Sequence, residues 1–390
     1  MKDVLTIIIP TRKRPNNLGR LLKYYDGRTS RFELIIADSS SGNHFLQNKN
    51  SCERSNLQTT HTEYSEEIPL VDKINSSLKE VQTPYVAICA DDDFISLVGL
   101  QSAIKFLIKN KSFSAAHGNY ISYCAKKTKS GVTFDWSPSY TDSRTISQSK
   151  PKNRLHAHHS DYTPTFYAVH RTSSIREGFE SAVTATDDVR FGELLPSMTA
   201  VINGKFKHLN VFYGARYNAQ QTGSTADNLR DFIQAGSFTS KYHRYRNSLA
   251  NRLEAQSDLT HEKSLTIVDD AMISYLVNSY RLPQEEATDL VKQGRVAKKI
   301  ANTSSSGSAE SASFPAKIRD WLQTTPVPKR AVSILENHYL GLPAFIIFII
   351  SGDVERANFY LKLDKPMIGD GEQLKQIRRS VQSHQEALNE

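Results

Sequence analysis

The first hundred residues alternate between short apolar runs and helical stripes, and this alternation restricts the fold more than any other feature. Leu5–Ile9 is a β-branched run that ends at Pro10, a pattern typical of a buried strand. Leu18, Leu21, Leu22 and Tyr25 then recur at the spacing of one apolar helix face. The same alternation predicts strands at Phe32–Ala37 and Tyr85–Ala90 and helices near 71–81 and 97–108. It predicts an α/β fold with a mostly parallel sheet flanked by helices.

The rest of the chain carries weaker but consistent patterns. Between 113 and 220 we expect strands at Ser114–Tyr123, Phe166–His170 and Phe206–Tyr213, and a helix at Val189–Ile202. Beyond about residue 225 the apolar spacing becomes helical. A Ser-rich stretch at 302–313 has the composition of a flexible loop. We therefore predict an α/β domain over residues 1–225 and a mostly helical C-terminal domain over 226–390 that contains this loop.

Composition excludes some classes of protein without choosing a function. The 390 residues carry a net charge of +8, which suits an anionic substrate, a nucleic acid or an acidic membrane face. The three cysteines form neither a disulfide framework nor a Cys-x-x-Cys metal motif. The N-terminus shows no signal-peptide pattern. The longest apolar stretch, Leu342–Ile350, is far shorter than the ~20 residues that span a bilayer.

Polar clusters follow each of the first three predicted strands. They are Thr11–Arg14, Asp38–Ser41 and Asp91–Asp93. Ligands of open α/β sheets bind beyond the carboxyl ends of the strands. We therefore expect the three clusters to meet at one edge of the sheet and to form a binding site there.

The acidic triplet Asp91–Asp93 is the most informative of these clusters. Adjacent carboxylates repel one another, and they are best tolerated in solvent or around a cation. Mg²⁺ and Mn²⁺ prefer oxygen ligands and often share them with substrate phosphates. The alternative is an exposed helix N-terminus, where acidic side chains offset the helix dipole. Because the triplet follows an apolar strand, we favour a divalent metal, Mg²⁺ or Mn²⁺, held by Asp91 and Asp93 beside the diphosphate of a sugar nucleotide.

Other residues are candidates for the same pocket. Asp38 could accept a hydrogen from a pyrimidine base, or it could close its strand with an Asx turn. Arg12 could meet the phosphates or the base of a nucleotide, although short charge runs are often only solvated. Lys73 and Asn75 lie on the helix before the third strand and could reach the same place.

A sugar transfer to a hydroxyl also needs a general base, usually a carboxylate. The segment 186–194 supplies three candidates at the start of a predicted helix: Asp187, Asp188 and Glu193. The two aspartates could instead cap that helix. Glu193 lies one turn further on and could project into the cleft. The sequence leaves this choice open.

Three segments together resemble bacterial family-2-like GT-A glycosyltransferases. They are Leu5–Arg12, Ile35–Ser40 and Thr83–Phe94. A closer resemblance is to a subgroup that acts on cell-surface polysaccharides and also has segments like Phe166–Arg171 and Phe191–Leu194. The resemblance covers roughly the first 215 residues and depends on the combination of motifs.

The resemblance implies a role for each matching residue. The Asp-x-Asp element falls on Asp91 and Asp93, with Asp92 between them. The nucleotide base is assigned to four residues: Pro10, Thr11, Arg12 and Asp38. The Glu-Asp pair that usually supplies the base is absent in its standard form, so the three carboxylates of 187–193 compete for that role. Inversion of configuration is implied as well.

The resemblance also implies the partners. They are a nucleotide-sugar donor and a glycan or lipid-linked saccharide acceptor, met in the cytoplasm or at the inner face of the membrane. The apolar stretch Leu340–Ile350 would suit peripheral membrane contact, although a buried core helix is the simpler interpretation. The oligomeric state is not indicated.

Two other functions are alternatives to a glycosyltransferase. A sugar nucleotidyltransferase uses a similar sheet but opens with a Gly-rich phosphate loop, and the segment 10–15 contains no glycine. A non-catalytic protein that binds a glycan or a lipid carrier is the second alternative. Nucleic-acid binding is disfavoured, because three carboxylates in the cleft would repel phosphate unless a cation intervened.

Overall fold

In this computed structural model, the described residues are 4–26, 32–128, 131–139, 144–217, 232–233, 236–296, 376, 377 and 379. The chain divides into two compact units, Met1–Ala297 with Pro366–Glu390, and Lys298–Lys365. Every described element belongs to the first unit. The predicted Ser-rich loop at 302–313 and the apolar stretch at 340–350 lie outside the described residues.

The elements follow one another along the chain in α/β alternation at first, and as helices towards the end. The strands are β1 Leu5–Thr11, β2 Glu33–Asp38, β3 Thr59–Glu63, β4 Tyr85–Ile88, β5 Phe94–Ile95, β6 Phe113–Thr128, β7 Gly131–Ser139, β8 Val169–Arg171 and β9 Lys205–Tyr217. The helices are α1 Pro15–Tyr25, α2 Gly42–Arg54, α3 Leu70–Glu80, α4 Leu97–Lys109, α5 Pro151–Ser160, α6 Thr172–Ala185, α7 Val189–Asn203, α9 Ser237–Ala255, α10 His261–Tyr280 and α11 Gln284–Gly294.

The described strands form one mixed sheet in the order β3-β2-β1-β4-β8-β6-β9-β5, with β7 paired to β6. The half that contains β1 to β4 is parallel, with Ile8 opposite Ile35 and Ile88. The short strand β8 then enters antiparallel between β4 and β6, and β6 pairs parallel with β9. The carboxyl ends of β1, β2 and β4 therefore lie side by side at one edge of the sheet.

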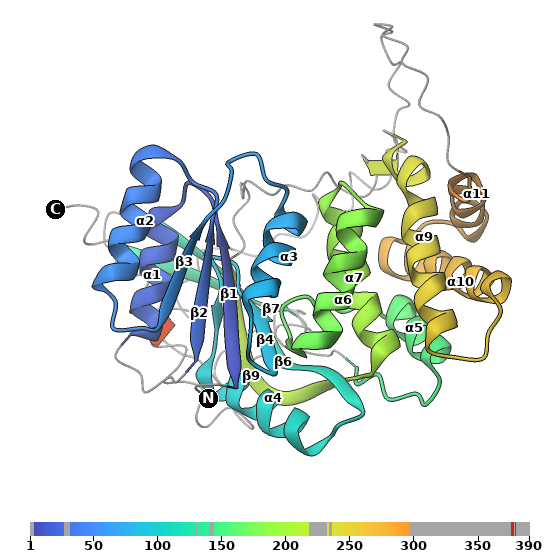
Figure 1. Cartoon of the computed structure of the whole chain (residues 1–390), viewed down its shortest axis with the longest axis horizontal. Coiled ribbons are helices and arrows are strands. Elements are labelled where there is room, and N and C mark those ends of the chain that lie inside the picture. The colour runs from blue at the N-terminus through green and yellow to red at the C-terminus, as the bar shows by residue number, and fades with distance from the viewer. Residues whose placement is uncertain are drawn as a thin grey trace, which may run out of the picture. The chain divides into compact units, whose positions relative to one another are not determined.

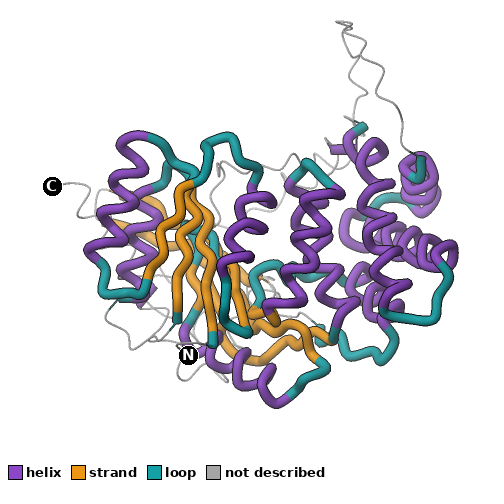
Figure 2. The backbone as a smooth tube through the Cα atoms, in the orientation of Figure 1, coloured by secondary structure: helices purple, strands orange, loops and turns teal. Residues whose placement is uncertain are grey.

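Helices cover both faces of the parallel half. Helices α1 and α2 lie on one side of β1 and β2, and α3 lies on the other (Figure 1). The core on the α3 side continues into α6, α7, α9 and α10, whose buried side chains include Phe191, Met198, Tyr245 and Met272. Figure 2 shows the sheet next to this helical part. None of the helices in the described part has the length and the apolar character needed to cross a membrane.

The predicted α/β class is confirmed, and the predicted strands and helices of the first hundred residues are present. The apolar stripe at 18–25 forms α1, and the predicted helix at Val189–Ile202 forms α7. Three further helices, α9, α10 and α11, form between 237 and 294. Helix α2 and strand β3 were not predicted, because they carry little apolar pattern: Asn48 and Cys52 are the buried residues of α2.

Candidate functional site

The polar clusters after β1, β2 and β4 meet at the carboxyl edge of the sheet, as predicted. The backbone N–H of Lys13 donates to Ser40 Oγ at 2.8 Å and links the first cluster to the second. Thr11 Oγ1 donates to Asp91 Oδ2 at 2.7 Å and links the first to the third. Lys13 has a φ of 55°, a left-handed conformation that non-glycine residues seldom adopt outside functional or constrained positions.

The three aspartates are buried at this edge, each at most 8% exposed. Arg14 Nη1 lies 3.3 Å from Asp91 Oδ1 and 2.9 Å from Asp92 Oδ2, so this guanidinium bridges the two carboxylates. The alternative of acids exposed at a helix N-terminus does not describe this geometry, because the carboxylates are buried and α4 begins later, at Leu97.

Asp93 faces a different set of partners, supplied by β9. Its Oδ1 accepts from the backbone N–H of Tyr217 at 2.9 Å, and its Oδ2 lies 3.4 Å from Arg216 Nε. The guanidinium of Arg216 also lies 4.5 Å from the ring centroid of Tyr167, a cation–π contact. The pairing of β5 with β9, with Phe94 opposite Ala215, brings these residues together.

Burial makes Asp91 and Asp93 costly to ionise. It raises the pKa of Asp91 to about 6; Asp92 adds repulsion, while Thr11 and Arg14 partly offset the rise. Burial likewise raises the pKa of Asp93 to about 6, although Arg216 stabilises its charge. The two arginines balance only part of the negative charge of the ionised triplet, and a further cation would stabilise the remainder.

The triplet fits a divalent metal that is shared with a substrate. Mg²⁺ and Mn²⁺ take carboxylate oxygens, and Mg²⁺ sites commonly use one or two carboxylates together with substrate phosphates. Among the described residues, no group of three His, Cys, Asp or Glu side chains gathers closely enough to hold a metal by itself. Asp91 and Asp93 would then supply protein oxygens, and the remaining ligands would come from the substrate and water.

Lys73 lies beneath the junction of the first two clusters. It is 4% exposed, and its Nζ donates to the carbonyl oxygen of Thr11 at 3.0 Å and to Ser39 Oγ at 2.8 Å. Burial lowers the pKa of Lys73 to about 8, although Asp38 and Asp91 both favour its charge. Lys73 therefore holds the ends of β1 and β2 together and places a cation between two carboxylates.

Asp38 is fully buried and makes the Asx turn that was one of its two predicted roles. Its Oδ1 accepts from the N–H of Ser40 at 2.8 Å. Its Oδ2 lies 2.9 Å from Asn48 Nδ2 and 3.0 Å from His61 Nε2. Burial opposes ionisation of Asp38, but these hydrogen bonds, that from His61 foremost, hold its pKa below the usual value.

The structure also describes three other predicted donor-side residues, Pro10, Arg12 and Asn75. Pro10 is part of β1, opposite Ala37. The side chain of Arg12 is 52% exposed and lies 3.7 Å from Glu66. Asn75 is buried, and its Oδ1 has no hydrogen-bond partner among the described residues. No hydrogen bond joins Arg12 or Asn75 to the triplet within the described part of the chain.

Asp187 and Asp188 are both tied to Lys241 on α9. Asp187 is 68% exposed and lies 2.9 Å from Lys241 Nζ, which lowers its pKa. Asp188 is the N-cap of α7, and its Oδ1 accepts from the N–H of Phe191 at 2.9 Å. The capping role that the sequence left open is thus present for Asp188.

Glu193 has a different environment from the other two carboxylates. Burial raises its pKa, while Arg216 and Arg190 partly offset the rise. Its interaction with Arg216 links it electrostatically to Asp93, which contacts the same arginine. Of the three candidates, Glu193 is therefore the one that shares a charged partner with the triplet.

Arg216 is the main residue that the sequence did not single out. The predicted strand ended at Tyr213, whereas β9 continues to Tyr217 and carries Arg216 to the site. The signal for it was weak, since nothing in the sequence indicates which strand pairs with Phe94–Ile95. Arg14 was part of the first predicted cluster, but its bridge between Asp91 and Asp92 was not foreseen.

Comparisons with protein families and with curated proteins found no match. Among solved structures, the chain is similar to S. aureus TarS 1–349 in complex with UDP-GlcNAc. The two share 14% identity over 93% of this chain and 91% of that one, with a TM-score of 0.48. It is also similar to the mannosyltransferase PcManGT from Pyrobaculum calidifontis in complex with GDP-Man and Mn²⁺: 13% identity over 93% and 87% of the chains, TM-score 0.40. Likeness at these values assigns no function.

Proposed function

We propose that this chain is a metal-dependent glycosyltransferase of the GT-A type, which moves a sugar from a nucleotide-sugar donor to a hydroxyl of a glycan or lipid-linked saccharide. The carrying observation is the buried triplet Asp91–Asp93 at the carboxyl end of β4, with Arg14 on one side and Arg216 on the other. The family resemblance of the sequence adds inversion of configuration and a role in bacterial surface polysaccharide synthesis. It also adds a location in the cytoplasm or at the inner face of the membrane.

The donor side would bind a charged diphosphate. Asp91 and Asp93 would hold Mg²⁺ or Mn²⁺, which supplies charge neutralisation for the departing diphosphate when it is bound. Arg14 places a guanidinium at the same edge, 3.3 Å from Asp91, and this group would bind a phosphate oxygen of the donor. Thr11 keeps Asp91 oriented through its hydrogen bond, and Lys73 fixes the backbone of Thr11.

The acceptor side would take its base from α7. Glu193 is desolvated, so its raised pKa makes it a better proton acceptor than an exposed carboxylate. Arg216 interacts electrostatically with both Glu193 and Asp93. Its positive charge would keep Glu193 ionised next to a negatively charged donor. Asp188 caps α7, and this fixes the start of the helix that carries Glu193.

The first test is donor binding and turnover. Purified protein should be stabilised by a nucleoside diphosphate or monophosphate in a thermal-shift screen, and it should release the nucleotide from a UDP-, GDP-, dTDP- or CMP-sugar, in both cases only with Mg²⁺ or Mn²⁺ present. Asp93→Asn should lower turnover by at least about a hundredfold, because it removes a charged metal ligand. Asp289→Asn on α11, whose carboxylate is 67% exposed, is the matched control and should keep full activity.

Two outcomes would contradict the proposal. If no nucleotide stabilises the protein in a metal-dependent way, the result favours the alternative of a non-catalytic protein that binds a glycan or a lipid carrier. Full turnover by a folded Asp93→Asn protein would remove the triplet from the reaction.

The second test identifies the base. Glu193→Gln should lower kcat by about 10²–10⁴, the usual contribution of a general base. Asp188→Asn should leave kcat nearly unchanged, since an asparagine oxygen still accepts the capping hydrogen bond from the N–H of Phe191. If the reverse order is measured, Asp188 is the base; if neither variant is slow, the base is Asp187 or lies outside segment 187–193.

A further inference from the structure

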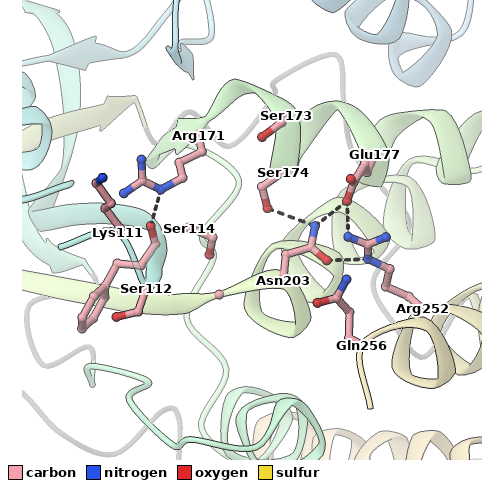
Figure 3. A pocket seen from close by; sticks show the side chains of 12 residues that line it. Lys111, Ser112, Ser114, Arg171, Ser173, Ser174, Glu177, Asn203, Arg252 and Gln256 are labelled. Atoms are coloured by element: carbon pink, nitrogen blue, oxygen red, sulfur yellow. Dashed lines mark hydrogen bonds and ion pairs between the residues drawn. The ribbon is translucent and has the colours of Figure 1, made fainter. Parts of the chain in front are cut away.

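A polar pocket lies at the opposite end of the sheet from the triplet. It has a volume of about 230 Å³ and opens where β6 and β9 begin, next to the first turn of α6 (Figure 3). Arg171, on its wall, donates to the hydroxyl of Tyr85, the first residue of β4, whereas the triplet follows the last residue of that strand. At ~3.3 Å per residue, β4 alone separates the two places by roughly 10 Å.

One wall of this pocket is basic, formed by Lys111 and Arg171. Arg171 donates to the carbonyl oxygens of Phe113, Leu107 and Asn110 and to the Tyr85 hydroxyl, all of them neutral acceptors. Lys111 is exposed at the rim. In the part of the chain that the structure describes, neither cation forms an ion pair, so no carboxylate neutralises their charge. Within this described part, the hydrogen bonds of Arg171 are mostly used within the chain, which leaves Lys111 as the cation with donors free for a ligand.

The first turn of α6 adds to this positive potential. The helix begins at Thr172, and its N-cap, Arg171, makes no side-chain capping hydrogen bond. Ser173 and Ser174 of this turn line the pocket. The amino end of a helix carries a partial positive charge, which favours an anion close by.

The opposite wall is neutral and rich in hydrogen-bonding groups. Asn203 Nδ2 donates to Ser174 Oγ at 3.1 Å and to Glu177 Oε2 at 2.7 Å. Glu177, the one carboxylate in the lining, is also paired with Arg252, so its charge is balanced within the wall (Figure 3). Gln256 contributes a further polar group to this wall. Phe113 and Ser114 line the pocket on the side of Lys111 and Arg171, where the carbonyl oxygen of Phe113 accepts from Arg171 Nε.

We propose that this pocket binds a monosaccharide that carries a phosphate group. The cations without an ion-pair partner and the start of α6 suit the phosphate, whereas the amide and hydroxyl groups suit the hydroxyls of a sugar. Ligand pockets commonly span ~300–1,000 Å³, so 230 Å³ suits a single sugar unit better than a longer chain. This inference does not depend on the function proposed for the triplet.

The test is calorimetric titration of the full chain with glucose 6-phosphate, inorganic phosphate and glucose. We expect saturable binding of glucose 6-phosphate, weaker binding of phosphate and the weakest binding of glucose. Lys111→Glu should weaken glucose 6-phosphate binding about tenfold, because it turns an attractive charge at the rim into a repulsive one. Lys49→Glu, the same charge reversal at an exposed position of α2, is the matched control and should bind as the unchanged protein does.

Asp93→Asn protein separates this site from the first one, since it should bind glucose 6-phosphate with unchanged affinity even where nucleotide binding is lost. Three results would overturn the inference. The first is no saturable binding by the unchanged protein. The second is equal affinity for phosphate and glucose 6-phosphate, which removes the sugar from the assignment. The third is an equal loss in Lys111→Glu and Lys49→Glu, which shows that only net charge matters.

Discussion

Lys73 allows a sharp test of how the donor edge is built. Its ammonium group is buried, donates to Thr11 and Ser39, and has a pKa lowered from 10.5 to about 8 by that burial. The unfolded chain keeps the usual pKa near 10.5. Between these two values the unfolded chain therefore binds a proton that the folded protein does not hold.

The sign and the size of the effect follow from this difference. Because the unfolded state binds more protons between pH 8 and 10.5, the contribution of Lys73 to the free energy of unfolding rises with pH across that window. Each pH unit is worth about 1.4 kcal/mol, so the full rise over these 2.5 units is at most about 3.5 kcal/mol. Below pH 8 both states are protonated, and the whole cost of burying the charge is present.

The assay is urea unfolding of the unchanged protein and of Lys73→Met at pH 7.5, 8.5, 9.5 and 10.5. Methionine keeps an unbranched side chain that is one atom shorter and removes its titration, so the difference between the two proteins isolates Lys73 from other groups that titrate at high pH. The unchanged protein should gain on the variant by about 2–3 kcal/mol between pH 7.5 and 10.5. Parallel stability curves would refute the reasoning, since they would show that Lys73 titrates alike in both states.

Two further predictions concern stability. Asp188→Ala should lower the free energy of unfolding by about 1 kcal/mol, because the hydrogen bond to Phe191 N is lost, while Asp188→Asn should stay close to the unchanged protein; equal losses in urea unfolding would contradict the cap. Burial lowers the pKa of His159 to about 3. Stability should therefore fall, by up to about 1.4 kcal/mol per pH unit, as the pH drops below 6.5, where unfolded histidine gains a proton. The unfolding midpoint of His159→Phe should change less between pH 7 and 5 than that of the unchanged protein, and an identical change would refute this.

The sequence predicted the parallel half of the fold because its signals there are local. The apolar runs of β1, β2 and β4 and the stripes of α1 and α3 are each visible within a dozen residues. Where strands and helices alternate, neighbouring strands run parallel, so the polar clusters that follow them lie at the same edge of the sheet, where ligands bind. The hydrogen bond from Thr11 to Asp91 follows from this arrangement.

Other parts of the site could not be predicted, because they depend on pairing between distant segments. Arg216 reaches Asp93 across 123 positions of the sequence, through the antiparallel pairing of β5 with β9. Strand β5 is two residues long, and no periodicity marks so short an element. Strand β3 was missed for another reason, since its residues Thr59–Glu63 are polar and it lies at the edge of the sheet.

The three carboxylates of segment 187–193 show how environment separates residues that the sequence could not distinguish. Asp187 is exposed beside Lys241, which favours its charged form and leaves it a weak base. Asp188 uses one oxygen as the cap of α7. Glu193, one turn inside the helix, is desolvated, and its pKa is raised despite Arg216 and Arg190. A carboxylate whose pKa moves towards the working pH is suited to proton transfer, so the same helix can use an aspartate to fix its start and the glutamate for chemistry. The comparison of Glu193→Gln with Asp188→Asn therefore tests this division of roles as well as the identity of the base.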